Sequence, residues 1–357
     1  MSGVSNLNRW GFLILYMTAL LAPLSLFSLP FPGVWGPLCI VFVLVPILDL
    51  VIGVRDFPAE PTEKRPLYFR FLPYTSVPIT LSYLIIGAYS FTQLELSFIE
   101  KLGLVLSWGV LAGIISINIA HELIHRKNKL DQAMGGLLLS MVSYGCFKVE
   151  HIRSHHVHVA TPKDNSTARL NENTYLFICR SLYKNFLTAL HLEQELCRRR
   201  GRSLITSELC LWYAISLVFC LILGLFFGIE GSLFFMSVSL VAAATLEVIN
   251  YIEHYGLKRR ETTTGFEQVS VHHSWNSSHL FSNLLLFNLP KHSDHHENPG
   301  RPYECLRHRS EAPQLPAGYG GMFLAALVPP IWKRIMNPRV QELNTKTSKA
   351  SEKPSYI

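Results

Sequence analysis

The sequence predicts an all-α integral membrane protein with six transmembrane helices and a histidine-rich cap on the cytoplasmic side. Composition is the first reason, because 49% of the 357 residues are hydrophobic and only 16% are charged. In an average soluble domain about a quarter of the residues carry a charge. The other two reasons are the spacing of the apolar windows and the distribution of lysine and arginine between them.

Six windows contain the roughly 20 apolar residues that a helix needs to cross about 30 Å of hydrocarbon. They fall at 11–29, 34–53, 72–92, 102–120, 209–228 and 232–251. The first window follows Arg9 and has no small-residue cleavage site before the second, so we interpret it as a retained span and not as a signal peptide.

The connections between the windows predict the orientation of the spans. The connections near 30, 93 and 229 contain a single lysine, Lys101, whereas 54–71 and the long loop 121–208 are rich in lysine and arginine. The positive-inside rule places these basic segments and both termini in the cytoplasm. We therefore expect a multi-pass protein of the bacterial inner membrane.

The rest of the chain predicts one membrane domain over 1–338, followed by a disordered polar tail over 339–357. Two apolar stretches, near 134 and near 319, are too short or too broken by proline to span, and we expect them to be buried or interfacial. Seven dispersed cysteines have no C-x-x-C spacing, which excludes a disulfide framework and a built-in rubredoxin-type iron site. The basic residues are too dispersed for a nucleic-acid surface.

Histidines carry the strongest functional signal, because they gather in four short motifs that the predicted topology places on one membrane face. HELIH at 121–125 and EHIRSHH at 150–156 place histidines four residues apart, on one face of a helix. NYIEHYG at 250–256 follows the sixth window, and HSDHH at 292–296 completes the set. The candidate metal ligands are His121, His125, His151, His155, His156, His254, His292, His295 and His296.

Nine imidazoles at a membrane boundary are costly to bury unless they are paired or bind metal. A structural or hydrolytic zinc site uses three or four protein ligands, so two metal ions with four or five histidines each fit the count better. Imidazole suits zinc, copper, iron and nickel, and the residues alone leave the metal open.

Other polar residues near the motifs are expected to support the ligands. Carboxylates beside the histidines are candidates to accept the second ring N–H of a ligand and fix its orientation: Glu122, Glu150, Glu253 and Asp294. We expect hydrogen-bonding or positioning roles for His272, His273 and His279, and solvated or interfacial positions for His158, His191 and His308.

The text of the motifs resembles one family in particular. HELIHRK, EHIRSHHVHVATPKD, NYIEHYG, HSWNSSHLFSNLLLFNLPKHSDHHENPGRPYECL and APQLPAGYGGM resemble the membrane alkane 1-monooxygenases, within the integral-membrane di-iron desaturases and hydroxylases. The resemblance implies that the nine histidines bind two iron ions. It also implies that rubredoxin, served by its reductase, supplies electrons and that O2 hydroxylates the terminal carbon of an alkane taken from the bilayer.

The chain departs from the family pattern at four positions without losing a ligand. Ile124 and Ser154 stand where glycine is usual, Asn165 where proline is usual, and Lys291 where arginine is usual. These departures leave the alkane length open, and the bulk of Ile124 is expected to shift a helix slightly.

An unactivated C–H bond needs an oxidant made from O2 at a redox metal, with the protein supplying orientation. We therefore expect a narrow apolar channel that admits the chain end first, lined by residues of 104–120 and 240–250. Small residues in these segments (Gly113, Ala242, Ala243 and Ala244) are equally explained by close helix packing.

Two other functions compete with this interpretation. One is a fatty acyl desaturase or hydroxylase of the same metal class, and the other is a histidine-rich metal transporter or binding protein, which would place its ligands along the spans. The basic run RRRGR at 198–202 is a candidate either for docking an acidic rubredoxin or for contact with anionic lipid head groups.

Overall fold

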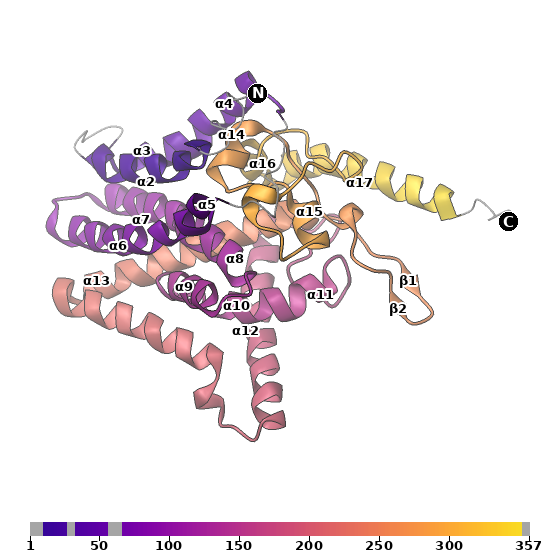
Figure 1. The fold of residues 1–357 in the computed structure, drawn as a ribbon. Helices are drawn as coiled ribbons and strands as arrows, with labels where there is room; N and C mark the ends of the chain where they lie inside the picture. The colour runs from indigo at the N-terminus through magenta and orange to yellow at the C-terminus, as the bar shows by residue number, and fades with distance from the viewer. Residues whose placement is uncertain (1–9, 27–32, 56–65, 352–357) are drawn as a thin grey trace.

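The computed structural model describes residues 10–26, 33–55 and 66–351, and helices dominate this part of the chain (Figure 1). Within it, strands are limited to a short antiparallel hairpin of β1 (Glu261–Thr262) and β2 (Gly265–Phe266). Four helical segments are long and apolar enough to cross a membrane: Gly33–Ile52, Leu67–Gln93, Phe98–Ile124 and Glu208–His254. The chain is a membrane protein, as its composition predicts.

The first three of these segments are built from several helical pieces. Gly33–Ile52 contains η2 (Gly33–Trp35), α3 (Gly36–Cys39), the π-helical turn η3 (Ile40–Leu44) and α4 (Val45–Ile52). Leu67–Gln93 contains α5 (Leu67–Phe71), η5 (Leu72–Thr75) and α6 (Ser76–Gln93). Phe98–Ile124 contains α7 (Phe98–Ala112), the π-helical turn η6 (Gly113–Ile117) and α8 (Asn118–Ile124). The first predicted span corresponds to α2 (Leu13–Ser25), a shorter apolar helix next to residues outside the described part.

The fourth segment, α13 (Glu208–His254), is two helical arms and not one straight helix. Forty-seven residues in a row would reach about 70 Å, more than twice the hydrocarbon thickness. Gly228 interrupts the helix with φ +69°, a conformation that favours glycine. The chain then folds back, because the Ser232 hydroxyl donates to the Cys220 carbonyl 3.0 Å away. The two arms correspond to the predicted spans 209–228 and 232–251.

The segment 121–208, expected as a long loop, contains helices of its own. They are α9 (Lys129–Ser140), α10 (Cys146–Glu150), the π-helical turn η7 (His151–His155), α11 (His156–His158), α12 (Thr174–Arg199) and η8 (Leu204–Thr206). The buried positions of α12 include Ser181, Asn185 and Glu193. Because these polar residues make α12 less apolar than a membrane span, a search for apolar windows does not detect this helix.

Short helices follow α13 and fold over its end. They are η9 (Val271–His273), α14 (Leu280–Leu285), α15 (His292–Glu297), η10 (Tyr303–Cys305), α16 (Tyr319–Ala326) and α17 (Pro329–Ser351). The stretch near 134 forms α9 and the stretch near 319 forms α16, both short and partly buried as expected. Helix α17 continues to Ser351, so the first part of the predicted disordered tail is helical; residues 352–357 lie outside the described part.

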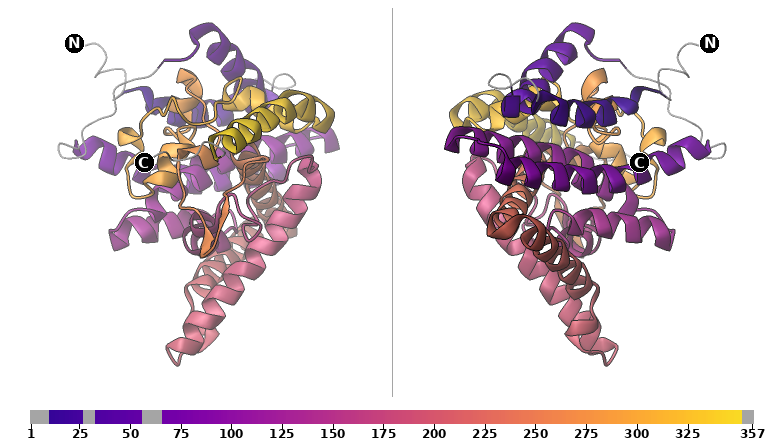
Figure 2. Two further views of the ribbon diagram at one scale, coloured as in Figure 1. Left: turned by 90° about the vertical axis from the view of Figure 1, so that its right-hand side faces the viewer. Right: turned by 90° about the vertical axis from the view of Figure 1, so that its left-hand side faces the viewer.

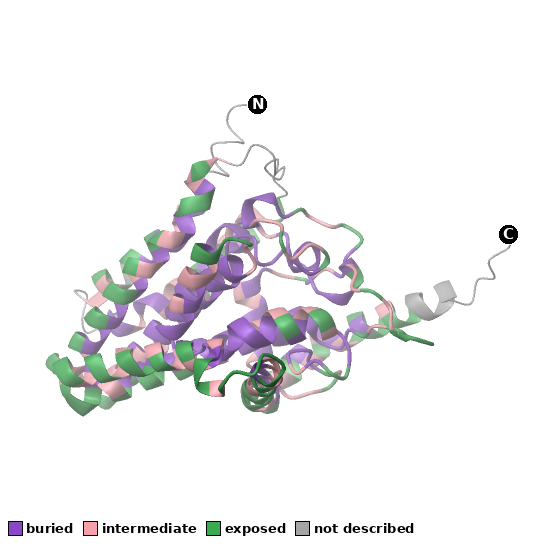
Figure 3. Cartoon of the chain, turned by 60° about the horizontal axis from the view of Figure 1, so that its bottom comes forward, coloured by how far each residue is buried: buried purple, intermediate pink, exposed green. Residues whose placement is uncertain are grey.

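Close approach of backbones holds the long helices together, and exposed side chains lie mainly along their outer faces (Figure 3). A side chain at Gly109 of α7 would come within 2.4 Å of Val241 in α13, so only glycine permits this contact without a shift. Asp49 of α4 accepts hydrogen bonds from the backbone N–H and hydroxyl of Ser282, which ties a span to α14. Together these contacts gather α8, η7, α15 and the end of α13 at one end of the long helices (Figure 1).

Candidate metal centre

All nine predicted ligands come together in two adjacent groups. Among the described residues, the five-histidine group consists of His121, His125, His151, His156 and His295, and the four-histidine group of His155, His254, His292 and His296. Within each group, one ring nitrogen from every residue lies within 4.8 Å of the others. The split matches the four or five ligands for each ion that the histidine count predicts.

The local helix geometry decides which histidine joins which group. His151 and His155 lie four residues apart in the π-helical turn η7, with rings stacked 5.2 Å apart, yet they belong to different groups. π-helical turns are rare and recur at functional sites. In α15, His292 and His296 join the four-histidine group while His295 points to the other. HELIH therefore keeps both of its histidines in one group, whereas the pair His151 and His155, expected on one helix face, is divided between the two groups.

The ring nitrogens converge in a way that hydrogen bonds cannot satisfy. In the five-histidine group, the Nε2 atom of His151 lies 3.0 Å from the Nε2 atoms of both His125 and His156. In the four-histidine group, Nε2 of His292 lies 3.1 Å from that of His254 and 2.9 Å from that of His296. A neutral imidazole has one donor and one acceptor nitrogen, so among three converging Nε2 atoms at least two are of the same kind, both donors or both acceptors, and cannot hydrogen-bond to each other.

Two further nitrogens point to a cation. Within the described part of the chain, Nε2 of His121 and Nε2 of His155 are buried and have no hydrogen-bond partner. Buried polar atoms are otherwise almost always paired. The two groups therefore fit two metal ions, each bound by imidazole nitrogens.

The histidines are held in the neutral form that binds metal. Burial, followed by the neighbouring histidines, lowers the pKa of His156, His295 and His296 well below the usual value. Burial also lowers the pKa of His125 to about 3. Since only neutral imidazole is a ligand, these rings need not lose a proton at neutral pH before they bind a metal ion.

Two partners fix the orientation of ligand rings in the four-histidine group. The Asp164 carboxylate lies 3.0 Å from Nδ1 of His155, and the backbone carbonyl of His273 lies 3.2 Å from Nδ1 of His254. Each leaves Nε2 directed at the group, as outer partners of metal-binding histidines commonly do. The sequence analysis missed Asp164, although it ends the quoted motif EHIRSHHVHVATPKD.

The four carboxylates expected to support the ligands have different surroundings. Glu253 lies 3.2 Å from Nε2 of His292 and accepts a 2.9 Å hydrogen bond from the Tyr319 hydroxyl. Glu122 pairs with Arg126 in the same helix, and Asp294 accepts from Arg301 and from the backbone N–H of Arg307. Glu150 is buried, with one carboxylate oxygen unpaired in the described structure. The Glu253 contact is with Nε2, the nitrogen directed at the group, and not with the second ring N–H, so the supporting role expected of all four carboxylates stays a prediction.

The remaining histidines lie outside the two groups in the described structure. His273 is buried and contacts Glu267 and Ser270, in keeping with a positioning role. His279 contacts the Ser277 hydroxyl, and His272 and His191 are exposed. The neighbouring HSWN residues lock the centre in place, because Asn276 exchanges hydrogen bonds with Ser293 at the start of α15.

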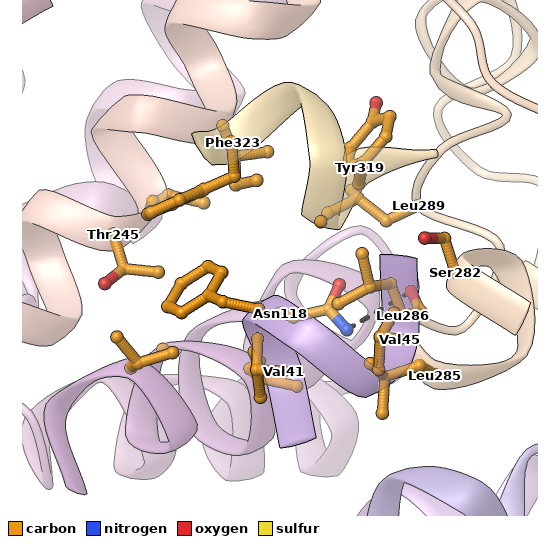
Figure 4. Close-up of a pocket in the computed structure, with 17 residues that line it drawn as sticks. Val41, Val45, Asn118, Thr245, Ser282, Leu285, Leu286, Leu289, Tyr319 and Phe323 are labelled. Carbon is orange, nitrogen blue, oxygen red and sulfur yellow. Dashed lines mark hydrogen bonds between the residues drawn. The ribbon is translucent and has the colours of Figure 1, made fainter. Parts of the chain in front are cut away.

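A narrow apolar cavity lies close to the histidine groups, and Figure 4 shows the residues that line it. Its volume is about 50 Å³, and most of the residues that line it are apolar. Asn118, Leu289 and Tyr319 line it close to the ligands: Asn118 and Leu289 precede His121 and His292 by three residues, and Tyr319 donates to Glu253. Figure 4 shows Phe323 and Thr245 at the other end, where Phe42 stacks on Phe323 with ring centroids 4.9 Å apart.

The cavity draws on both segments that the sequence analysis proposed for a channel. Val110, Gly113, Ile114 and Asn118 come from 104–120, and Thr245, Leu246 and Ile249 come from 240–250. Gly113 lines the cavity and also approaches α13, with the Ala242 carbonyl 3.3 Å from where its side chain would begin. The alanines 242–244 are not among the lining residues.

Apolar membrane helices carrying two groups of buried histidines define a class of membrane metalloprotein, and comparison with known proteins gives the family. The fatty acid desaturase family model matches residues 101–325. Alkane 1-monooxygenase 2 of Alcanivorax borkumensis is 42% identical over 94% of this chain and 92% of its own length. Alkane 1-monooxygenase 2 of Pseudomonas aeruginosa is 42% identical over 94% and 93%. The xylene/toluene monooxygenase hydroxylase component of Pseudomonas putida is 25% identical over 95% and 91%. The chain belongs to the membrane alkane 1-monooxygenases, within the fatty acid desaturase family.

Proposed function

We propose that this protein hydroxylates the terminal carbon of alkanes with O2, at two iron ions held by the nine histidines and reduced by rubredoxin. The observation that carries the proposal is the junction of an apolar cavity with two groups of convergent imidazoles. The similarity to alkane 1-monooxygenases over nearly the whole chain supports the same substrate class.

One set of side chains binds the hydrocarbon, and another set holds the metal ions. When bound, the irons supply the O2-derived oxidant that an unactivated C–H bond requires. Valine, leucine and phenylalanine side chains of the cavity exclude water and bind the alkane, at about 0.8 kcal/mol for each buried methylene. Asp164 and the His273 carbonyl hold His155 and His254 with Nε2 toward the ion. The Glu253 carboxylate, held by Tyr319, stands between the cavity and His292.

The topology that we propose has six membrane crossings, with both termini in the cytoplasm of a bacterial cell. Two crossings come from the arms of α13, three from Gly33–Ile52, Leu67–Gln93 and Phe98–Ile124, and one from the segment that contains α2. This arrangement supports delivery of the substrate from the bilayer to a centre at the cytoplasmic ends of the helices.

A basic cleft beyond the end of α13 is the surface that we propose for rubredoxin. The cleft, of about 430 Å³, is lined by the cations Arg169, Lys258 and Arg259 and by the carboxylates Asp164 and Glu261. Asp164 contacts His155 of the four-histidine group. An electron donor bound in this cleft would therefore be separated from a candidate metal ligand by one residue, Asp164. The basic rim complements an acidic partner and would raise its association rate.

The desaturase alternative is less consistent with the cavity. Recognition of an acyl carrier or a head group requires charged or strongly polar side chains near the substrate path, because buried charges need partners. The described lining of the cavity contains no charged residue, and its polar members are Asn118, Thr245, Ser282 and Tyr319. All four are already engaged: Asn118 with the Leu286 carbonyl, Ser282 with Asp49, Thr245 with the Val241 carbonyl and Tyr319 with Glu253.

The direct test is to express the full chain with a rubredoxin and its reductase and to supply alkanes of graded length. We expect 1-alkanols, identified by gas chromatography with mass spectrometry, and formation that depends on O2 and on rubredoxin. The matched controls are the variant His254→Ala, which removes a candidate ligand, and His191→Ala, which removes an exposed histidine outside both groups. Unsaturated products from acyl substrates, or alcohol formation that survives His254→Ala, would contradict the proposal.

A further inference from the structure

A groove separate from the metal centre lies where the end of α12 meets the start of α13. These two helices project to one side of the bundle (Figure 2). The groove has a volume of about 640 Å³, and Arg200, Arg202, Ile205, Leu211 and Ala214 are among the residues that line it. It therefore combines cations and apolar side chains in one hollow.

The acidic groups of the groove are already neutralised. Glu193 pairs with Arg153 and also accepts a 2.9 Å hydrogen bond from the backbone N–H of Glu208. The Glu208 carboxylate pairs with Lys148 and Arg153. Arg200 and Arg202 are exposed, and within the described residues neither guanidinium has an ion pair or a side-chain hydrogen bond. The groove thus offers two free guanidinium groups and no free carboxylate among its described residues.

The two arginines that precede Arg200 have ion-pair partners. Arg198 and Arg199 both pair with Glu195, at 2.8 Å each, and neither lines the groove. Of the four arginines in the basic run, only the two in the groove remain available for an outside anion. A role in topology alone would not require this division, because the positive-inside rule counts charges and not their pairing.

The apolar wall of the groove is formed by Ile205 of η8 and by Leu211 and Ala214 at the start of α13. Leu211 is 51% exposed and Ile205 is 79% exposed, and α13 is a membrane-span candidate from Glu208 onward. An exposed apolar wall at the start of a span faces lipid, and the arginines lie at the level of the head groups. Charged and apolar side chains are therefore close together in the groove, as the phosphate and the acyl chains are in a phospholipid.

We propose that this groove binds an anionic phospholipid, with its phosphate between Arg200 and Arg202 and an acyl chain along Leu211 and Ala214. Arginine suits this role, since its planar guanidinium binds phosphate oxygens in a bidentate manner. A basic site at a membrane surface favours anionic over zwitterionic lipid. The site requires the phosphate and the chain together, which separates it from a general anion site.

The test measures lipid retained by the full-length protein in nanodiscs that contain phosphatidylglycerol and phosphatidylcholine. The double variant Arg200→Gln/Arg202→Gln is expected to lower the bound phosphatidylglycerol, by native mass spectrometry, roughly tenfold. The control Arg198→Gln/Arg199→Gln removes the same charge from the same helix end and is expected to retain the bound phosphatidylglycerol. Ala214→Phe, which fills the apolar wall and leaves both arginines, is expected to lower retention as well. Thermal unfolding of each variant in phosphatidylcholine alone identifies any that fail to fold.

Several outcomes would overturn the proposal. Equal retention by the two double variants would mean that paired and unpaired arginines act alike. Displacement of phosphatidylglycerol by millimolar inorganic phosphate, or unchanged retention in Ala214→Phe, would mean that the groove binds a free anion. A change in oligomeric state caused by Arg200→Gln/Arg202→Gln, without loss of lipid, would assign the groove to contact with a second copy of the chain.

Discussion

Asp164 connects the metal centre to the aqueous side of the protein through a single side chain. Its carboxylate lies 3.0 Å from Nδ1 of His155 and also accepts a 2.6 Å hydrogen bond from the Thr167 hydroxyl. The second bond fixes the carboxylate, and the carboxylate in turn fixes the imidazole. Partners of this kind commonly change metal affinity by 10–100-fold. An effect on metal retention is therefore expected from a residue that touches no ion itself.

The protein as purified should contain two iron ions per chain, and single substitutions should lower that number selectively. His254→Ala removes a ligand of the four-histidine group and is expected to reduce the content to about one ion, since the five-histidine group is untouched.

Asp164→Ala should weaken retention by roughly 10–100-fold, and Asp164→Asn should weaken it less because its amide oxygen can still accept from Nδ1. Inductively coupled plasma mass spectrometry after dialysis against a chelator measures the content. Full occupancy in His254→Ala, or zinc in the active protein, would refute the assignment.

Phe42 is the side chain expected to limit alkane length. It lines the cavity on the second predicted span and stacks on Phe323, which Figure 4 shows at the end away from Tyr319. Phe42→Ala should lengthen the space and extend the range to longer alkanes with attack still at the terminal carbon. Each further buried methylene is worth about 0.8 kcal/mol, or about fourfold in affinity.

The matched control for this prediction is Phe91→Ala. Phe91 is also half-buried on a span, and its ring packs on Phe234, 5.5 Å away, without lining the cavity. Competition between alkanes of graded length gives the preference of each variant. If Phe42→Ala leaves the preference unchanged, or moves oxidation to internal carbons without altering length, the end-first cavity is the wrong path.

Among the elements, η7 shows why the ligand set could be predicted from the sequence but its division could not. Spacing of histidines at four residues predicted nearness on a helix, and the structure confirms it for His121 and His125. The π-helical turn changes the spacing over His151–His155, so that its two ends serve different groups. Sequence periodicity assumes a regular helix and contains no signal for a π turn. The contact between Asp164 and His155 was not predicted for a related reason. Asp164 lies in a loop, and loops have no periodicity from which a contact can be inferred.

The Ile124 departure shows how a neighbouring element absorbs a larger residue. Ile124 is 1% exposed at the end of α8. Gly135 of α9 faces it so closely that a side chain at Gly135 would begin 2.7 Å from an Ile124 methyl group. The absence of a side chain at Gly135 therefore leaves the room that Ile124 occupies. A pairing of this kind is visible only once the two helices are in contact.

The break in α13 leads to a prediction about topology at the level of one element. If the two arms are separate crossings, the turn at Gly228 lies outside the cytoplasm, while the α12 to α13 turn near Gly201 lies inside it. Alkaline phosphatase, which is active only in the periplasm, should be active when fused after residue 230 and inactive when fused after residue 201. The two fusion points flank the first arm of α13, so each is the control for the other. Equal activity at both points would show that this arm does not cross the membrane.

At the scale of the whole molecule, the two reactants reach the centre by different routes. The apolar cavity lies among the spans and ends near Asn118, Leu289 and Tyr319. The basic cleft lies beyond the end of α13 and reaches His155 through Asp164. Composition and charge predicted the membrane spans, and histidine count predicted the centre. The contribution of 104–120 and 240–250 to the cavity was predicted, but that of 41–45, 282–289 and 319–323 was not, nor was the cleft, because these segments are distant in the sequence.

The separation of these routes makes the docking of the electron donor testable apart from substrate binding. Two basic surfaces compete for rubredoxin: the cleft with Arg169 and Lys258, and the run at 198–202, which lies at the far end of α12 from the centre (Figure 1). Arg169→Gln/Lys258→Gln should raise the KM for rubredoxin several-fold and flatten its dependence on salt, because surface charges act chiefly on association. The KM for alkane should stay the same, since the cavity contains neither residue. Arg200→Gln/Arg202→Gln removes equal charge from the arginines of the run that are unpaired in the described structure and should leave both constants unchanged. Turnover measured against rubredoxin concentration at graded ionic strength gives these values, and the reverse result for the two variants would place the donor at the end of α12.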